Sequence, residues 1–256
     1  MKLSFNLPIA QPYKSPSQRI RVLTEDWVVR QIYCPSCGSK IIQSCRNSPV
    51  FDFSCKECRE EFELKSKKDF LGKKIVDGAY QTMMERLRST NNPSLFFLNY
   101  NPQSFQVINF LVIPKHFFIP DVIEIRKPLA QTAQRAGWIG CNILMDKIPD
   151  AGRIFFIRNQ IVEPKSRVLR VWNKALFLQE EKLKQSKGWI LETMKCIDSL
   201  GKKEFALNDV YAFETVLRNK YPNNKHIKDK LRQQLQILRD RGYIDFVSKG
   251  QYKLSY

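Results

Sequence analysis

Features that would place this chain of 256 residues in a membrane or outside the cell are missing from its sequence. No apolar run approaches the roughly 18 residues of a membrane-spanning helix. Prolines and polar residues break up the first 14 residues, which do not form a signal-peptide pattern. The sequence also lacks the low hydrophobic content of a disordered chain. Of its residues, 43% are hydrophobic, which predicts a folded core. We therefore expect a cytoplasmic globular protein with no membrane partner.

Acidic residues are scarce relative to basic ones. The chain has 25 Asp and Glu against 43 Lys and Arg, which gives a formal net charge of +18. Such a charge attracts phosphate polymers through Coulomb steering and counterion release. A generally basic, soluble surface is the alternative, so the charge favours nucleic acid only together with the motifs below.

A disulfide framework is not expected, because the seven cysteines are odd in number and the chain carries no export signal. Four of them form two C-x-x-C pairs, Cys34/Cys37 and Cys55/Cys58, at a spacing typical of zinc sites. Four cysteine ligands leave no open position for water, so we predict structural Zn²⁺. A redox pair or a chance pairing remains the alternative. The other cysteines are predicted to be free thiols: Cys45, Cys141 and Cys196.

Acidic and basic residues flank the second cysteine pair. Asp52 precedes it, and Glu63 and Lys65 follow it in the alternating run 61–65, which predicts a strand with both side chains on one face. If this strand pairs with 50–53, Asp52 comes beside that face. Two carboxylates and a lysine suit Mg²⁺-assisted phosphodiester hydrolysis. A solvated strand face with an ordinary ion pair is the alternative, because D…E-x-K also occurs by chance.

The first 182 residues are predicted to form an α/β domain. The patterns predict helices at 16–31, 74–89, 130–135 and 165–178, a β-ribbon between the cysteine pairs, and strands at 50–53, 61–65, 95–100, 105–113 and 154–157. Within it, Arg135 and Trp138 stand in the run RAGWIGC. Trp138 is either a core residue or an aromatic surface for a ligand.

Residues 183–256 are predicted to form a separate winged-helix domain. A helix, a brief strand, two further helices and a strand–turn–strand follow one another in this segment. On the third helix, a polar face opposite the apolar stripe can contact base edges and phosphates in the major groove. A protein-binding winged helix is the alternative. The residues of this face are Lys225, Lys228, Arg232, Gln233 and Gln236.

Taken together, the runs LTEDWV, DFSCKECREEFELKSKK, DGAY, RKPLA, RAGWIGCNI and HIKDKLRQQLQILRDRG closely resemble the DpnI-like, methyl-directed type II (type IIM) restriction endonucleases of restriction-modification systems. The resemblance runs nearly end to end. It implies a PD-(D/E)xK nuclease domain with an embedded four-cysteine zinc site, followed by a winged helix, and cleavage of double-stranded DNA at N6-adenine-methylated GATC by reading the site with both domains.

The resemblance also assigns roles to individual residues. Asp52, Glu63 and Lys65 become catalytic, with Asp52 and Glu63 binding Mg²⁺, although Phe51 stands where the wider nuclease signature has proline. Trp138 becomes a candidate for packing on adenine methyl groups, with Arg135 beside it. We expect a monomer. The rival hypotheses are a non-catalytic zinc-ribbon and winged-helix regulator, and a nuclease of the same fold with another target.

Overall fold

The computed structural model describes residues 1–43, 51–89, 92–180 and 186–255. They form two compact units, one of Met1–Asp146 with Gly152–Trp172 and one of Lys147–Ala151 with Asn173–Tyr256. Within the described ranges, every helix is too short or too polar to cross a lipid bilayer.

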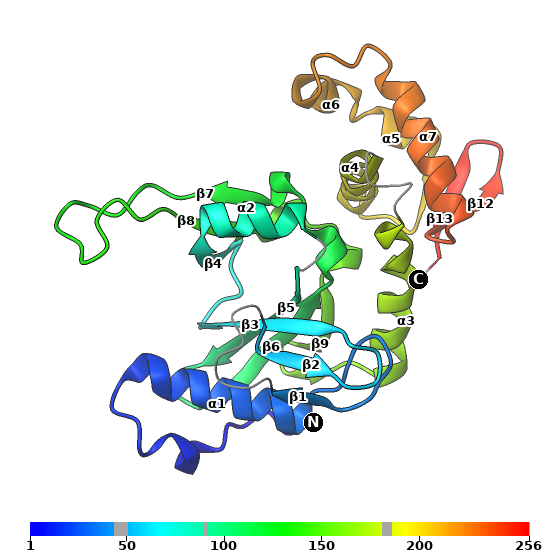
Figure 1. The fold of residues 1–256 in the computed structure, drawn as a ribbon. Coiled ribbons are helices and arrows are strands. Elements are labelled where there is room, and N and C mark those ends of the chain that lie inside the picture. The colour runs from blue at the N-terminus through cyan, green and yellow to red at the C-terminus, as the bar shows by residue number, and fades with distance from the viewer. Residues whose placement is uncertain (44–50, 90–91, 181–185, 256) are drawn as a thin grey trace. The chain divides into compact units, whose positions relative to one another are not determined.

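A seven-stranded sheet forms the centre of the first unit (Figure 1). Strands β3 and β5 are parallel, and every other neighbouring pair is antiparallel. The strands expected at 61–65, 95–100, 105–113 and 154–157 are confirmed, as is the ribbon between the cysteine pairs, which β1 and β2 form. The strand expected at 50–53 is shifted along the chain, because only Phe53 of it belongs to β2 and Asp52 precedes that strand. Cys45 and residue 50 lie outside the described residues. In spatial order the strands are β1 (Ile41–Gln43), β2 (Phe53–Cys55), β3 (Glu61–Lys68), β5 (Ser94–Asn101), β6 (Gln106–Ile113), β9 (Ile154–Arg158) and β10 (Ile161–Val162).

Aromatic side chains fill one face of this sheet. Phe62 and Phe96 stack with their ring centroids 4.3 Å apart, and Phe110 lies 5.2 Å from Phe96. The Trp27 ring centroid lies 5.4 Å from that of Phe110, and the Trp172 ring centroid lies 6.4 Å from that of Phe62. The helices that carry these tryptophans, α1 (Pro16–Gln31) and α3 (Lys165–Ala175), therefore cover the same face. Burying each such side chain contributes about 1.5–3 kcal/mol. Because successive strand residues alternate in direction, Glu63 and Lys65 of β3 point to the opposite face.

The helices expected at 16–31 and 165–178 are confirmed in position. The first is α1 (Pro16–Gln31), and the second is α3 (Lys165–Ala175), extended by a 3-10 turn. The 3-10 turns of the chain are η1 (Leu7–Ala10), η2 (Lys115–Phe117), η3 (Pro120–Val122), η4 (Met145–Lys147), η5 (Asp150–Gly152) and η6 (Leu176–Gln179).

A second, three-stranded sheet follows β3 and corrects the sequence-based prediction. The helix expected over 74–89 is wrong in its first half, which is strand β4 (Lys74–Ala79); only α2 (Tyr80–Arg88) is helical. Strand β8 (Gly140–Leu144) pairs with β4 on one side and with β7 (Ile123–Ile125) on the other. Ile75 and Asp77 are buried alternately along β4, so pairing with β8 outweighs the helical spacing of the apolar residues.

The connection from β7 to β8 is a long loop of residues 126–139, which Figure 1 shows projecting from the small sheet. The short helix expected over 130–135 is wrong, because residues 131–137 form a series of turns. Gly137 adopts a φ of 76°, which a helix does not allow, and its N–H donates to the carbonyl of Leu129 across the loop.

The second unit has the element order of a winged helix, as expected. The elements are α4 (Lys187–Ser199), β11 (Glu204–Ala206), α5 (Leu207–Tyr211), α6 (Glu214–Lys220), α7 (Ile227–Asp240), β12 (Ile244–Ser248) and β13 (Gln251–Leu254). The three strands form one antiparallel sheet in the order β11-β13-β12. The expected second helix is divided into α5 and α6. Leu231, Leu235 and Leu238 of α7 are fully buried and confirm the predicted apolar stripe.

Candidate functional site

The four cysteines of the two C-x-x-C pairs come together in the first unit. Their sulfur atoms all lie within 4.8 Å of one another. The Sγ atoms of Cys34 and Cys58 are 3.4 Å apart, and those of Cys37 and Cys55 are 3.5 Å apart. A tetrahedral zinc ion with Zn–S bonds of about 2.3 Å requires sulfur separations of about 3.8 Å. The cluster can therefore hold zinc with only small adjustments.

Both cysteine pairs sit on turns of the same shape. The N–H of Gly38 donates to the carbonyl of Cys34, and the N–H of Arg59 donates to the carbonyl of Cys55. Gly38 and Arg59 each follow the second cysteine of their pair, with φ angles of 79° and 62°. A left-handed conformation costs a non-glycine residue about 1–2 kcal/mol, so the repetition at Arg59 indicates that the cluster imposes this turn.

Burial makes the cluster costly without a cation. It raises the pKa of both Cys34 and Cys58. At the exposed Cys37 burial has the same effect, but hydrogen bonds with Ser39, Cys55 and Cys58 outweigh it and lower the pKa to about 7. Zinc binds thiolates, and its charge offsets the cost of removing their protons in a buried place. The donor set and its burial thus fit a structural metal.

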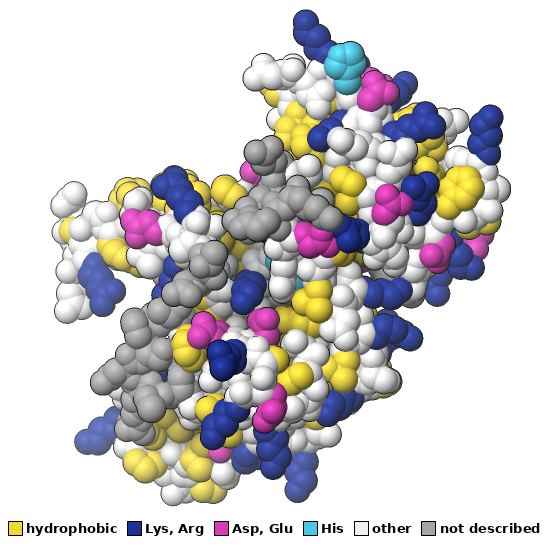
Figure 2. All heavy atoms as spheres, turned by 45° about the vertical axis from the view of Figure 1, so that its right-hand side comes forward, with side chains coloured by type: hydrophobic (Ala, Val, Ile, Leu, Met, Phe, Trp, Pro, Cys, Tyr) yellow, Lys and Arg dark blue, Asp and Glu magenta, His cyan; other side chains and the backbone are white. Residues whose placement is uncertain are grey.

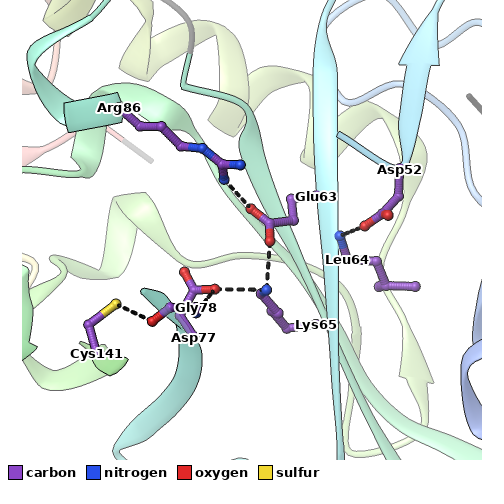
Figure 3. Close-up of polar contacts among 8 residues, drawn as sticks. All are labelled: Asp52, Glu63, Leu64, Lys65, Asp77, Gly78, Arg86 and Cys141. Atoms are coloured by element: carbon purple, nitrogen blue, oxygen red, sulfur yellow. Dashed lines mark hydrogen bonds and ion pairs between the residues drawn. The ribbon is translucent and has the colours of Figure 1, made fainter. Parts of the chain in front are cut away.

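The second turn joins β2 and β3; Asp52 directly precedes β2, and Glu63 and Lys65 lie on β3. Strand β2 ends at Cys55 and β3 begins at Glu61, and Phe53 pairs with Phe62 across them. Asp52 continues this pairing, because its N–H donates to the carbonyl of Phe62. Its carboxylate accepts a hydrogen bond of 2.7 Å from the N–H of Leu64, so it lies directly against β3 (Figure 3).

Glu63 and Lys65 project from β3 toward the small sheet and α2 (Figure 3). The Nζ atom of Lys65 lies 2.6 Å from Glu63 Oε1 and 2.7 Å from Asp77 Oδ1. Arg86 of α2 lies 3.4 Å from the other oxygen of Glu63. The carboxylate of Asp52 is not among these ion pairs within the described residues. A cavity of about 160 Å³ adjoins the group and is lined by Glu63, Lys65, Asp77, Gly78, Ala79, Thr82, Met83 and Arg86.

Burial and charge have opposite effects on the two residues of β3. Burial raises the pKa of Glu63, although the nearby Lys65 partly offsets this effect. Burial acts to lower the pKa of Lys65, but the carboxylates of Asp77 and Glu63 outweigh it and raise the pKa above its usual value. Lys65 is therefore held as an ammonium ion at neutral pH. A charged donor at this position can stabilise negative charge on a bound phosphate.

Asp77 was not singled out from the sequence. On the expected helix, Asp77 had no position that indicated a function. On β4 it points inward, and its side chain is only 5% exposed. The adjacent β-branched residues Ile75 and Val76 in KIVDGA were the available signal, since such residues favour strands. The four-residue spacing of Ile75, Ala79 and Met83 concealed it.

Trp138 and Arg135 lie in the loop 126–139, which connects β7 to β8. Arg135 is exposed and Trp138 is half-buried. The Trp138 ring packs over Gly140, where an added Cβ would approach the ring to 2.7 Å. The carbonyl of Ile139 accepts a hydrogen bond from the N–H of Tyr80, which ties this end of the loop to the start of α2.

In the second unit, the five predicted contact residues all lie on the surface. Lys225 precedes α7, and Lys228, Arg232, Gln233 and Gln236 are exposed along it. Lys228 pairs with Glu214 at 3.2 Å. A groove of about 520 Å³ separates α7 from the β12–β13 hairpin, and its lining includes Arg232, Gln236, Arg239, Phe246, Lys249 and Tyr252. Arg239, which lies on α7, was not predicted. Phe246, Lys249 and Tyr252 were not predicted either, because only the fold brings the hairpin beside α7.

Basic side chains are spread over the protein surface. Figure 2 shows Lys and Arg across the face in view, with fewer Asp and Glu among them. This distribution agrees with the net charge of +18 and suits a polyanionic partner.

Two family models match consecutive parts of the chain. The model of DpnI, described as the Dam-replacing family, matches residues 1–181. The model of its C-terminal part, described as the Dam-replacing HTH domain, matches residues 185–254. The first match includes the cysteine cluster and the ion pairs of Lys65, and the second runs from before α4 into the final strand.

Proposed function

The chain belongs to the DpnI, or Dam-replacing, family, and from this premise we propose that it is a Mg²⁺-dependent type II restriction endonuclease. Its proposed substrate is double-stranded DNA carrying N6-methyladenine in GATC, which both domains read. The family membership confirms the resemblance drawn from the sequence motifs. The observation that best supports cleavage is the charged Lys65 beside Glu63 on β3, with Asp52 on the paired segment.

We assign the first domain, residues 1–182, to the PD-(D/E)xK nucleases. Asp52 and Glu63 are the proposed Mg²⁺ ligands, because carboxylate oxygens are the donors that this ion prefers. When bound, Mg²⁺ polarises the phosphate and lowers the pKa of a coordinated water. Lys65 lies between the carboxylates of Glu63 and Asp77. Its proposed role is to orient or activate that water, or to stabilise the negative charge that develops on the phosphate.

Zinc has a structural role in this proposal. Cys34, Cys37, Cys55 and Cys58 would bind it, leaving no open position for a substrate or water. The ion would hold the turn between β2 and β3, and through it the spacing of the proposed Mg²⁺ ligands.

Recognition is divided between the loop 126–139 and the winged helix. Trp138 offers an apolar ring that gains contact from an added methyl group, and Arg135 is exposed beside it. The winged helix, proposed as residues 183–256, presents Arg232, Gln233 and Gln236 for base edges. Lys225 and Lys228 are proposed to contact phosphates.

Digestion of plasmid DNA tests the proposal. The protein is incubated with GATC-methylated and unmethylated plasmid, with and without Mg²⁺. We expect fragments only from methylated plasmid with Mg²⁺, with ends at GATC. Failure to cut either plasmid would refute the enzyme and support a non-catalytic DNA-binding regulator. Equal cutting of both, or fragments unrelated to GATC, would indicate a nuclease with another target.

A further inference from the structure

Asp77 is a buried carboxylate at the end of a different sheet from Lys65. Its side chain is 5% exposed, and an unpaired charge at such a position is strongly destabilising. Its Oδ1 atom accepts hydrogen bonds from the N–H of Gly78 at 2.7 Å and from the ammonium of Lys65 at 2.7 Å. The carboxylate is thus fixed by its own backbone and directed at one cation.

The backbone around Asp77 is also irregular at this point. Asp77 pairs with Cys141 of β8, but the next register pair is Ala79 with Gly140, so Gly78 is an extra residue on β4. Such bulges re-aim side chains and are frequent beside active sites. Here the bulge adjoins the residue that contacts Lys65.

The two partners of Lys65 differ in what they do when a metal binds. Glu63 is the proposed Mg²⁺ ligand, and a divalent ion on its carboxylate would repel the neighbouring ammonium of Lys65. Asp77 belongs to the other sheet, so it remains available to Lys65 when Glu63 is engaged. Without Asp77, Lys65 would lose its remaining anionic partner at that stage.

We propose that Asp77 is a positioning residue, which holds the ammonium of Lys65 in place while Glu63 binds Mg²⁺. Asp77 itself touches neither DNA nor the metal in this assignment. The inference rests on the proposed nuclease function and adds to it a residue from outside the β2–β3 pair.

The test compares Asp77→Asn with a matched control, Glu124→Gln. Asparagine preserves the shape and the acceptor for the Gly78 N–H but removes the charge. Glu124 also belongs to the small sheet and pairs with Lys74 at 2.7 Å, but it makes no contact with Lys65. The full chain is used throughout, with a methylated GATC duplex as the DNA probe.

Three quantities are measured: the single-turnover cleavage rate with Mg²⁺, the duplex affinity with non-cleaving Ca²⁺, and the melting temperature. We expect Asp77→Asn to slow cleavage by about 10–100-fold, as is typical for partners of catalytic groups, with unchanged affinity and melting temperature. Asp77→Glu should recover part of the rate because it restores the charge. Glu124→Gln should behave as wild type in all three measurements.

Two results would overturn the inference alone: wild-type cleavage by Asp77→Asn, or a slower rate matched by an equal loss of affinity or by unfolding. An inactive wild-type protein would instead refute the proposed function, and the inference with it.

Discussion

Replacing Cys37 by serine tests whether a metal holds the cysteine cluster together. Cys37 suits this purpose because its side chain is exposed, so removing the sulfur costs little packing. Its Sγ atom nevertheless lies 3.5 Å from that of Cys55, within the cluster. A serine hydroxyl does not ionise at neutral pH and replaces a thiolate poorly as a zinc ligand. Any loss of stability therefore reports on the metal.

The expected loss is large. Structural zinc contributes roughly 10–16 kcal/mol in small zinc-dependent domains, against a total stability of about 5–15 kcal/mol for an ordinary domain. If losing one ligand removes about 5 kcal/mol, roughly half of the lower value, the first unit should melt about 10–20 °C lower, at about 2–4 °C per kcal/mol for its size.

Cleavage should fall as well, although Cys37 is remote in sequence from β3. Its partner Cys55 is the last residue of β2, and Cys58 lies in the turn that leads to β3. Loss of the ion would loosen this turn and alter the spacing between Asp52 and Glu63. Ser36→Ala in the first turn is the matched control, because it leaves all four sulfurs in place.

The measurements are the zinc content per chain by mass spectrometry and the melting temperature by circular dichroism. We expect about one zinc per chain in wild type and Ser36→Ala, as for any four-cysteine site, and a reduced content in Cys37→Ser. A zinc-free Cys37→Ser protein that melts with wild type would refute the structural role. Full zinc content in that variant would refute Cys37 as a ligand.

Further substitutions test the proposed site and the DNA-binding surfaces. Lys65→Ala should abolish plasmid cleavage but leave gel-shift binding intact, and surviving cleavage would exclude its catalytic role. Trp138→Ala should reduce the difference in binding free energy between methylated and unmethylated DNA by about 1–3 kcal/mol. An unchanged difference would show that Trp138 does not contact the methyl group. Arg232→Ala should relax base preference, at about 1–3 kcal/mol if the contact is bidentate, whereas Lys228→Ala should weaken all sequences alike and lower the salt dependence of binding by about one unit. Burial raises the pKa of Glu63, so the protonated carboxyl stabilises the folded state, and this stability is lost as the pH rises above the usual pKa of 4.5. The melting temperature of Glu63→Gln should therefore exceed that of wild type by more at pH 7 than at pH 4. A larger difference at pH 4 would contradict the burial effect.

Local patterns predicted the central sheet well. Strands β5 and β6 have long apolar runs separated by a short turn, so their pairing follows from near neighbours in sequence. Alternation along β3 correctly placed Glu63 and Lys65 on the face opposite Phe62. The winged helix was equally accessible, because its helices are short, amphipathic and separated by clear breaks.

The sequence by itself determined the cysteine spacing, the strand that carries Glu63 and Lys65, and the basic character that suits DNA. Only the tertiary structure decided that residues 74–79 are a strand and that Asp77 meets Lys65. The physical reason is that the apolar spacing in this segment fits a helix or a strand, and a partner far along the chain makes the choice. Asp77 pairs with Cys141 of β8, and no local signal specifies that contact.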